Sequence, residues 1–240
     1  MQGHDTMSPV YEDIEVALVD AMGSDLSVVN AARVSFNKES SWKGGEENCL
    51  KKGDKGLISY LARNNHWTPF GHAFATFRIK APLFVARQLV KHTVGLCWNE
   101  VSRRYVTYEP TFYAIGTWRG RPKNMKQGSK GDPHSMTQAQ AHDTANSAIA
   151  HALTAYTEMI KNGVAPEQAR MVLPQTMMTE WYWSGSLAAW GRVCKLRLDP
   201  HAQKETAYVA QGIDAHMSKL FPTSWKALMR RSGKPLAKEA

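Results

Sequence analysis

The sequence predicts an α+β fold, because segments with the two-residue period of a strand alternate with segments of helical spacing. Residues 73–80 alternate apolar with mostly polar side chains, which is typical of a strand with one buried face. Residues 136–162 repeat small apolar side chains at helical spacing. No Gly-x-Gly-x-x-Gly run follows a strand and no Walker-type loop is present, so the sequence predicts neither a Rossmann domain nor a P-loop.

The first predicted elements lie before residue 82. Residues 15–21 are expected to form a strand, and residues 26–32 a short helix. A second helix is expected over residues 55–64, with Asp54 as its N-cap. The alternating strand at residues 73–80 follows this helix.

In the middle of the chain, the sequence predicts a helix that is followed later by a long loop. Pro82 suits the first turn of a helix that carries Arg87, Gln88 and Lys91. Residues 116–133 are rich in glycine and lysine and are expected to form a loop.

Three helices are predicted after this loop. The first spans residues 136–162 and should bury a stripe of small side chains against a neighbouring helix. This stripe consists of Ala141, Ala145, Ala148, Ala152, Ala155 and Met159. A shorter helix should start near Pro166 and stop before Pro174, and another should begin after the Asp199-Pro200 pair.

Composition predicts one domain over residues 1–240 with anionic partners. The chain has 43% hydrophobic residues and no Pro/Ser-rich linker, so it can bury one sizeable core. The formal net charge of +9 favours nucleotides, nucleic acid or an acidic membrane surface. The basic tail at residues 230–240 is expected to be a solvated end rather than a binding site.

The cysteines and the N-terminus indicate a soluble, cytoplasmic protein. Cys49, Cys97 and Cys194 are scattered and odd in number, which argues for a reducing compartment and against a disulfide framework or a zinc site. The N-terminus lacks the pattern of a signal peptide, and no apolar run approaches the roughly 20 residues that span a bilayer. No metal site is expected.

The stretch at residues 87–105, RQLVKHTVGLCWNEVSRRY, gathers cationic and hydrogen-bonding side chains. Arg87 with Lys91, and Gln88 with His92, stand four residues apart and would share a helix face. The polar segment after them predicts a structured loop of the kind that often carries function. A solvated basic helix end is the alternative.

This stretch contains the first part of a family resemblance. NEVSRRY at residues 99–105 resembles half of the signature of flavin-dependent thymidylate synthases. Three further stretches resemble the same family in the same order: DLSVVNAARVSF, HWTPFGHAFATFRIKAPLFVARQ, and ARMVLPQTMMTEWYW running on to KLRLDPHAQKE. The resemblance covers residues 16–228 and leaves out the variable segment 118–133 and the tails.

The chain also departs from the family pattern. Lys91 and Thr93 stand where the family usually has arginine, and the loop between Thr93 and Asn99 is one residue longer. Lys91 keeps the positive charge but loses the bidentate fork of arginine, whereas Thr93 keeps neither. Ser186 and Arg192 stand where the family usually has asparagine.

The resemblance implies an antiparallel sheet with flanking helices, FAD bound without a Rossmann domain, and a homotetramer with active sites between subunits. It also implies reductive methylation of dUMP to dTMP. Methylenetetrahydrofolate would provide the carbon, NADPH the reducing equivalents, and the reduced flavin the hydride that completes the methyl group. dUMP and folate are therefore the expected partners, without nucleic acid or membrane.

Matching the motif positions implies the site residues. On the nucleotide side they are Gln88, Glu100, Ser102, Arg103, Arg104, Arg170 and Arg197. On the cofactor side they are Ser35, His66, Thr68, Lys91, His92, Glu100, Ser186, Arg192 and His201. Arg104 and Arg170 suit the 5′-phosphate as bidentate donors. Arg197 is the implied catalytic residue, because its charge would stabilise negative charge that develops on the pyrimidine ring.

Several of these residues also have simpler explanations. His66 and His72 can hold a turn, and Arg33 and Arg170 can be ordinary salt-bridge residues. The aromatic run at residues 181–183 is expected in the core or at a subunit contact.

Neither candidate nucleophile is assigned to catalysis. Cys97 is expected to be an incidental thiol, because the implied chemistry needs no enzyme nucleophile. Ser102 has no visible His-Asp relay and is assigned to substrate binding.

Two other functions stay open at this point. The same chemistry, methylation or hydroxymethylation, on dCMP or UMP would need nearly the same cradle. A basic nucleic-acid-binding protein would instead bind any duplex with strong salt dependence and would hold no flavin.

Overall fold

The centre of the protein is a four-stranded antiparallel sheet. The structure is a computed structural model that describes residues 7–122 and 128–230. The sheet has the order β2 (Glu15–Met22), β3 (Phe74–Pro82), β6 (Met178–Ser186), β4 (Leu96–Glu100). A short parallel pair, β1 (Val10–Glu12) with β5 (Thr111–Tyr113), lies outside it. The prediction of an α+β fold with an antiparallel sheet and flanking helices is confirmed.

Parts of two predicted segments lie outside the described residues. They are residues 123–127, within the variable segment 118–133, and residues 231–240 of the basic tail.

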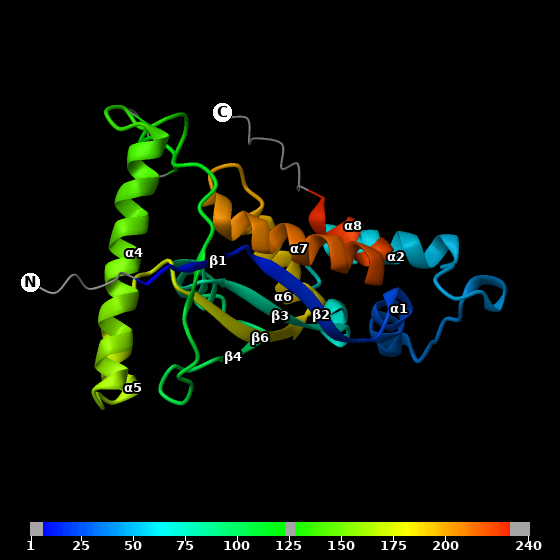
Figure 1. The fold of residues 1–240 in the computed structure, drawn as a ribbon. Coiled ribbons are helices and arrows are strands. Elements are labelled where there is room, and N and C mark those ends of the chain that lie inside the picture. The colour runs from blue at the N-terminus through cyan, green and yellow to red at the C-terminus, as the bar shows by residue number, and fades with distance from the viewer. Residues whose placement is uncertain (1–6, 123–127, 231–240) are drawn as a thin grey trace, which may run out of the picture.

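Helices cover one face of the sheet and both ends of the molecule (Figure 1). The α-helices are α1 (Asp25–Arg33), α2 (Lys52–Arg63), α3 (Leu83–Leu89), α4 (Gln138–Lys161), α5 (Pro166–Ala169), α6 (Leu187–Arg197), α7 (Lys204–Leu220) and α8 (Pro222–Met229). The 3₁₀ helices are η1 (Val34–Phe36), η2 (Lys43–Gly45), η3 (Thr68–His72) and η4 (Arg170–Val172). Figure 1 shows α6 and α7 along the sheet, α4 standing at one end with α5 at its foot, and α1 and α2 at the other end.

The buried face of the sheet follows the alternation of β3. Phe77 and Ile79 are fully buried and lie opposite Trp183 and Trp181 on β6. The predicted strand at residues 73–80 is therefore confirmed, as is the core position of these two tryptophans. Tyr182 between them is 47% exposed, because neighbouring side chains of a strand point to opposite faces.

Helix α6 is held on the sheet by an aromatic cluster. Trp190 packs edge-on against Phe77 and Trp183, with ring centroids 5.1 and 5.0 Å away, and its indole N–H donates to the Ala75 carbonyl at 3.2 Å. The sequence did not predict α6, because it is apolar over most of its surface and lacks a helical stripe. Its final residue is Arg197.

The prediction that residues 96–100 belong to a loop is wrong. They form β4 and pair with residues 181–185 of β6. Gly95 starts the strand at a φ of 73°, a conformation that suits glycine, and a side chain at Gly185 would collide with Leu96. The pairing partners lie 81 to 89 residues away in sequence, so local patterns do not reveal them.

Asp54 is not the N-cap of α2. The helix begins at Lys52, and Asp54 lies inside it, 1% exposed. Its carboxylate accepts hydrogen bonds from Arg33 at 2.5 Å and Ser40 at 2.6 Å. Burial raises the pKa of Asp54, but the hydrogen bonds from Ser40 and Arg33 outweigh burial and lower the pKa overall. Arg33 is thus a salt-bridge residue.

Two other helix boundaries differ from the predictions. Helix α3 ends at Leu89, so Lys91 and His92 lie in the following turn rather than on a helix face with Arg87 and Gln88. Helix α7 begins at Lys204, several residues after the predicted start at the Asp199-Pro200 pair.

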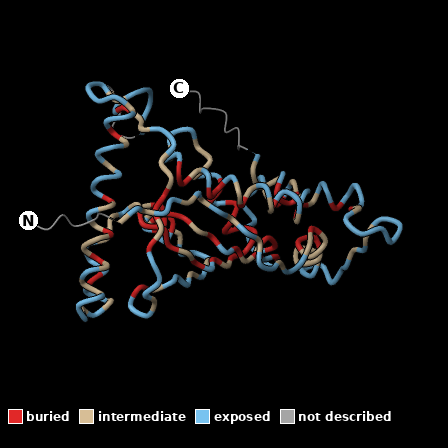
Figure 2. The backbone as a smooth tube through the Cα atoms, in the orientation of Figure 1, coloured by how far each residue is buried: buried red, intermediate tan, exposed pale blue. Residues whose placement is uncertain are grey.

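Helix α4 confirms the predicted long helix but not its small-residue stripe. Of the stripe, only Ala141 is buried, and Ala148 is exposed. The helix packs instead through Ile149 and Leu153 against Phe112 and Met177. Figure 2 shows that buried residues concentrate around the sheet, whereas α4 consists mainly of exposed and partly buried residues.

No helix among residues 7–122 and 128–230 is both long enough and apolar enough to cross a lipid bilayer.

Asp25 connects the first helix with the last one. It is 5% exposed, and its carboxylate accepts hydrogen bonds from the backbone N–H groups of Thr223 and Ser224, both at 2.8 Å. These donors belong to the first turn of α8 and have no partner within the helix. Asp25 therefore caps α8 from a distant part of the chain.

We expect Asp25→Ala to lower the free energy of unfolding by about 2–4 kcal/mol, because it leaves one buried and one partly buried N–H donor without an acceptor. Urea unfolding measures this loss. Asp143→Ala on the exposed face of α4 is the control and should change little. Equal stability of both variants would show that the cap contributes nothing.

Candidate functional site

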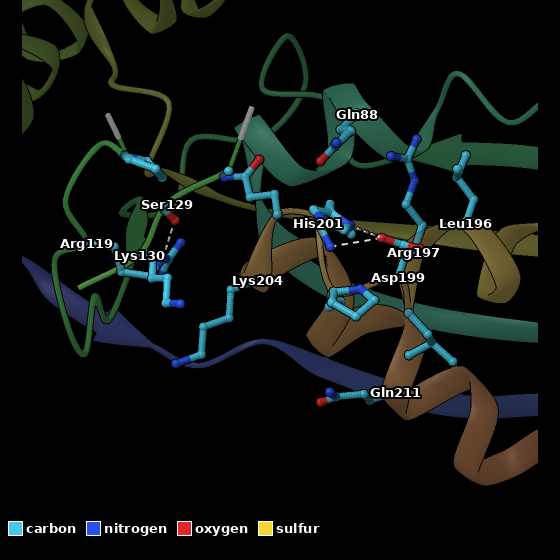
Figure 3. A pocket seen from close by; sticks show the side chains of 17 residues that line it. Gln88, Arg119, Ser129, Lys130, Leu196, Arg197, Asp199, His201, Lys204 and Gln211 are labelled. Carbon is cyan, nitrogen blue, oxygen red and sulfur yellow. Dashed lines mark hydrogen bonds and ion pairs between the residues drawn. The ribbon is translucent and has the colours of Figure 1, made fainter. Parts of the chain in front are cut away.

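A cavity of about 1130 Å³ lies between the end of α6, the start of α7 and residues 119–122 and 128–130 of the variable segment. Its walls include Gln88, Arg197 and His201, three of the residues that the sequence analysis selected. Figure 3 shows Arg197 and His201 on one side and Arg119, Ser129 and Lys130 on the other, with Lys204 between them. The volume is sufficient for a ligand of nucleotide size.

Arg197 is held by a neutral histidine. Its Nε donates a hydrogen bond to Nε2 of His92 at 3.0 Å, so this histidine nitrogen must be unprotonated. Burial, and then the charges of Arg197 and Arg192, lower the pKa of His92. Burial also lowers the pKa of Arg197, yet a guanidinium stays charged at neutral pH. The pair therefore presents one fixed positive charge to the cavity.

Three other predicted residues surround this pair. Gln88 accepts a hydrogen bond from the Thr206 hydroxyl of α7. His201 lies 2.9 Å from the Asp199 carboxylate. Arg192 donates to the Val94 carbonyl at 2.6 Å, which ties α6 to the turn before β4.

A second group of predicted residues follows β4 and lies near α5. Arg104 lies 3.3 Å from the Glu167 carboxylate, and Arg170 donates to the Glu167 carbonyl at 3.2 Å. The Ser102 hydroxyl accepts from the Arg104 N–H, and Glu100 accepts from Thr179. Arg104 and Arg170 are exposed, and both contact Glu167.

A third group lies at the other end of the molecule. Ser35 belongs to η1, Thr68 opens η3, and the His66 ring packs edge-on against Tyr60 at 5.7 Å. Among the described residues, no hydrogen bond or ion pair connects this group with the cavity. Lys91 is exposed in the turn after α3.

Two further predicted residues are buried and take part in local contacts. Arg103 is 6% exposed, donates to the Tyr108 carbonyl at 2.8 Å, and stacks its guanidinium 4.7 Å above the Tyr108 ring. Ser186 is 7% exposed and caps α6 by accepting from the Ala189 N–H. Both side chains hold the fold locally and do not face the cavity.

No sequence motif indicated the residues that complete the cavity on its second side. These are Arg119, Ser129 and Lys130 from the variable segment and Lys204 from α7. The lysine-rich composition of segment 118–133 was the available signal, but nothing local indicated that it folds against α7.

The model of the family described as "Thymidylate synthase complementing protein" matches residues 17–223. The chain belongs to this family. The resemblance found in the sequence is therefore confirmed.

Relatives of known name agree with this membership. The chain is similar to a flavin-dependent thymidylate synthase from Thermus thermophilus, with 37% identity over 219 residues, 91% of this chain and 77% of the relative. It is 36% identical to the Thermotoga neapolitana enzyme of the same name over 92% of this chain and 94% of the relative.

A solved structure is also similar. A UMP/dUMP methylase from Streptomyces cacaoi, bound with 5-Br dUMP, superposes with a TM-score of 0.77 at 31% identity. The match covers 91% of this chain and 96% of the methylase.

We expect the free energy of unfolding to depend on pH through His92, which accepts the hydrogen bond from Arg197. Because the folded pKa of His92 is lowered, the unfolded chain takes up a proton at about pH 6.5, before the folded chain does. The free energy of unfolding should therefore fall as the pH drops from this value toward the folded pKa. His92→Gln keeps an acceptor for Arg197 but does not titrate, so it should flatten this part of the curve in urea unfolding.

His151→Gln is the matched control, because His151 is exposed on α4 and lies outside the cavity. It should keep the wild-type slope. An unchanged slope in His92→Gln would contradict the assignment of the proton to His92.

Proposed function

We propose that this chain catalyses the flavin-dependent reductive methylation of dUMP to dTMP, with methylenetetrahydrofolate as carbon donor and NADPH as reductant. The observation that supports the proposal most directly is the Arg197–His92 pair at the wall of the cavity, in a chain that belongs to the thymidylate synthase complementing family. The active site and its residues are part of this proposal.

Arg197 would stabilise the negative charge that develops on the pyrimidine during reaction. A fixed cation in a partly buried site is most effective when it does not have to reorganise, and the hydrogen bond to His92 restrains the guanidinium. Because His92 is neutral, it holds Arg197 without competing for its charge. Gln88, which lines the same cavity, would orient the ring by hydrogen bonding.

FAD is the cofactor that we propose, and its reduced form would supply the hydride. The available donors suit an anionic dinucleotide: Lys91 is exposed, and Arg192 uses one guanidinium nitrogen for Val94 and remains exposed otherwise. His92 and His201 would complete the contacts near the cavity, and Ser35, His66 and Thr68 would add contacts from the other end of a chain. Ser186 would donate from its hydroxyl, because its oxygen accepts from the Ala189 N–H and the O–H stays available.

The separation of the residue groups supports a homo-oligomer, and we propose a homotetramer. Arg104 and Arg170, which would hold the 5′-phosphate, lie near α5, whereas the η1 and η3 residues lie near α1 at the opposite end (Figure 1). One small ligand cannot bridge both ends of one chain. Copies of the chain that place these groups beside one another's cavities would complete each site.

UMP is a second candidate substrate. The solved methylase that resembles this chain is named for both UMP and dUMP and has been solved with 5-Br UMP as well. Discrimination between the two nucleotides depends on one 2′-hydroxyl, and a site built around the base and the phosphate would accept either.

The test is mass spectrometry of products after purified protein is incubated with FAD, NADPH, methylenetetrahydrofolate and an equal mixture of dUMP, dCMP and UMP. Conversion of dUMP to dTMP is the expected result. A methylated or hydroxymethylated product from UMP or dCMP alone would identify that nucleotide as the substrate in place of dUMP. Salt-dependent duplex binding without any product would instead favour a nucleic-acid-binding protein.

We expect Arg197→Ala to retain FAD and to lose kcat by about 10²–10³-fold, the typical effect of removing one charge-stabilising donor. Single-turnover formation of dTMP by the FAD-loaded variant measures this loss.

Lys195→Ala is the matched control for this variant. It removes an exposed positive charge from the same helix turn, and Lys195 does not line the cavity. Its kcat should stay near that of the wild type. Wild-type turnover by Arg197→Ala would remove Arg197 from catalysis.

A further inference from the structure

The described ends of the variable segment, residues 118–122 and 128–133, are joined to each other beside the cavity. The Gly120 N–H donates to the Gly131 carbonyl at 2.7 Å, and the Lys130 N–H donates to the Gly120 carbonyl at 3.0 Å. A side chain at Gly120 would collide with the Asp132 carbonyl. Gln138 at the start of α4 binds both backbone groups of Trp118. The two arms of the segment are thus joined at their base.

An ion pair then fastens this segment to α7. Arg119 donates from one nitrogen to both carboxylate oxygens of Glu205, at 2.8 and 3.0 Å, and from Nε to the Ser129 hydroxyl at 2.7 Å. Glu205 is only 6% exposed, so its charge needs a partner. Arg119 therefore connects both arms of the segment to the first turn of α7, and Glu205 neutralises its charge.

Two other cations of the cavity have no such partner. Lys130 from the segment and Lys204 from α7 both line the cavity. Within residues 7–122 and 128–230, no carboxylate lies within 4.0 Å of either ammonium. The Lys204 ammonium lies 5.7 Å from the Tyr208 ring.

The neighbouring acids are already engaged. Asp199 binds His201, and Asp132 accepts from the Gln138 amide at 2.9 Å. Two unpaired cations on separate elements that face one cavity form a site for an anion.

We propose that Lys130 and Lys204 form an anion subsite, which binds the acidic end of a ligand whose reacting part lies at Arg197, and that the Arg119–Glu205 pair positions this subsite. The inference rests on the proposed function. The ligand chemistry is a carboxylate or phosphate anion. Its first source is the glutamyl tail of the folate, because the 5′-phosphate is already assigned to Arg104 and Arg170. The phosphate of the nucleotide is the second source and would replace that assignment. Arg119 and Glu205 are positioning residues, because their charges are satisfied by each other.

The first experiment measures KM and kcat of the FAD-loaded full chain with dUMP and with methylenetetrahydrofolate carrying one or three glutamates. Lys130→Ala and Lys204→Ala should each raise KM for one ligand about 3–10-fold, the worth of one exposed charge-assisted contact. The effect should appear in KM more than in kcat and should shrink at high salt. Lys219→Ala, an exposed lysine of α7 outside the cavity, is the control.

The ligands distinguish the two sources of the anion. A KM effect that grows from one to three glutamates would assign the subsite to the folate tail. An effect on dUMP alone would assign it to the phosphate. Values equal to those of Lys219→Ala for both ligands would overturn the subsite.

Direct binding separates this inference from the proposed function. Tryptophan fluorescence titration with the same folates and with dUMP gives dissociation constants whether or not product forms. A wild type that makes no dTMP, with weaker anion binding in both lysine variants, would reject the proposed function and keep the subsite. If the wild type makes dTMP but the lysine variants bind the anions as well as the wild type does, the proposed function is kept and the subsite is rejected.

A double-mutant cycle tests the positioning role of Arg119. Arg119→Ala should weaken binding about as much as Lys130→Ala, and the combined variant should be no worse than either, because both changes remove the same contact. Arg119→Lys should restore part of the binding, since it keeps a charge for Glu205. Full additivity of the two alanine variants would reject positioning through Lys130.

Discussion

The contact between Trp190, Phe77 and Trp183 is the interaction on which the site depends. It presses α6 onto the buried face of β3 and β6, with two edge-on ring contacts and one indole hydrogen bond to the Ala75 carbonyl. Three buried aromatic side chains contribute several kcal/mol of apolar burial, and their geometry permits one orientation of the helix. Arg197 is the last residue of this helix, so the packing that orients α6 also determines where the guanidinium lies.

The electrostatics of the cavity follow from burial. His92 is kept neutral by partial burial beside two arginines, and this neutrality lets it accept a hydrogen bond from Arg197. Arg119 and Glu205 instead neutralise each other, which allows the carboxylate of Glu205 to be buried at the start of α7. Net charge alone therefore does not describe the site, because only the cations without such partners remain to attract an anion.

The polar face of the sheet and the wide separation of the predicted site residues would have the same explanation in an assembly of several copies. Arg78, Glu180 and Tyr182 lie on the face opposite the helices, where a single chain leaves Arg78 and Tyr182 exposed and Glu180 partly exposed. Arg104 and Arg170 lie near α5, and the η1 and η3 residues lie near α1 at the opposite end of the same chain. An enzyme assembled from several copies would cover such a face and bring such groups together.

The sequence by itself determined the features that depend on neighbouring residues. The alternation at residues 73–80 predicted β3, the long run at residues 136–162 predicted α4, and the Asn-Glu-x-Ser-x-Arg-Tyr motif predicted the family. Only the tertiary structure decided that residues 96–100 pair as a strand, that α6 lies in the core, and that Arg103 points inward.

The contacts that build the cavity were equally inaccessible from local pattern. Arg197 and His92 are 105 residues apart, and Arg119 and Glu205 are 86 apart. Such contacts depend on how distant segments pack, and an apolar helix such as α6 carries no periodic signal of which neighbour it will meet.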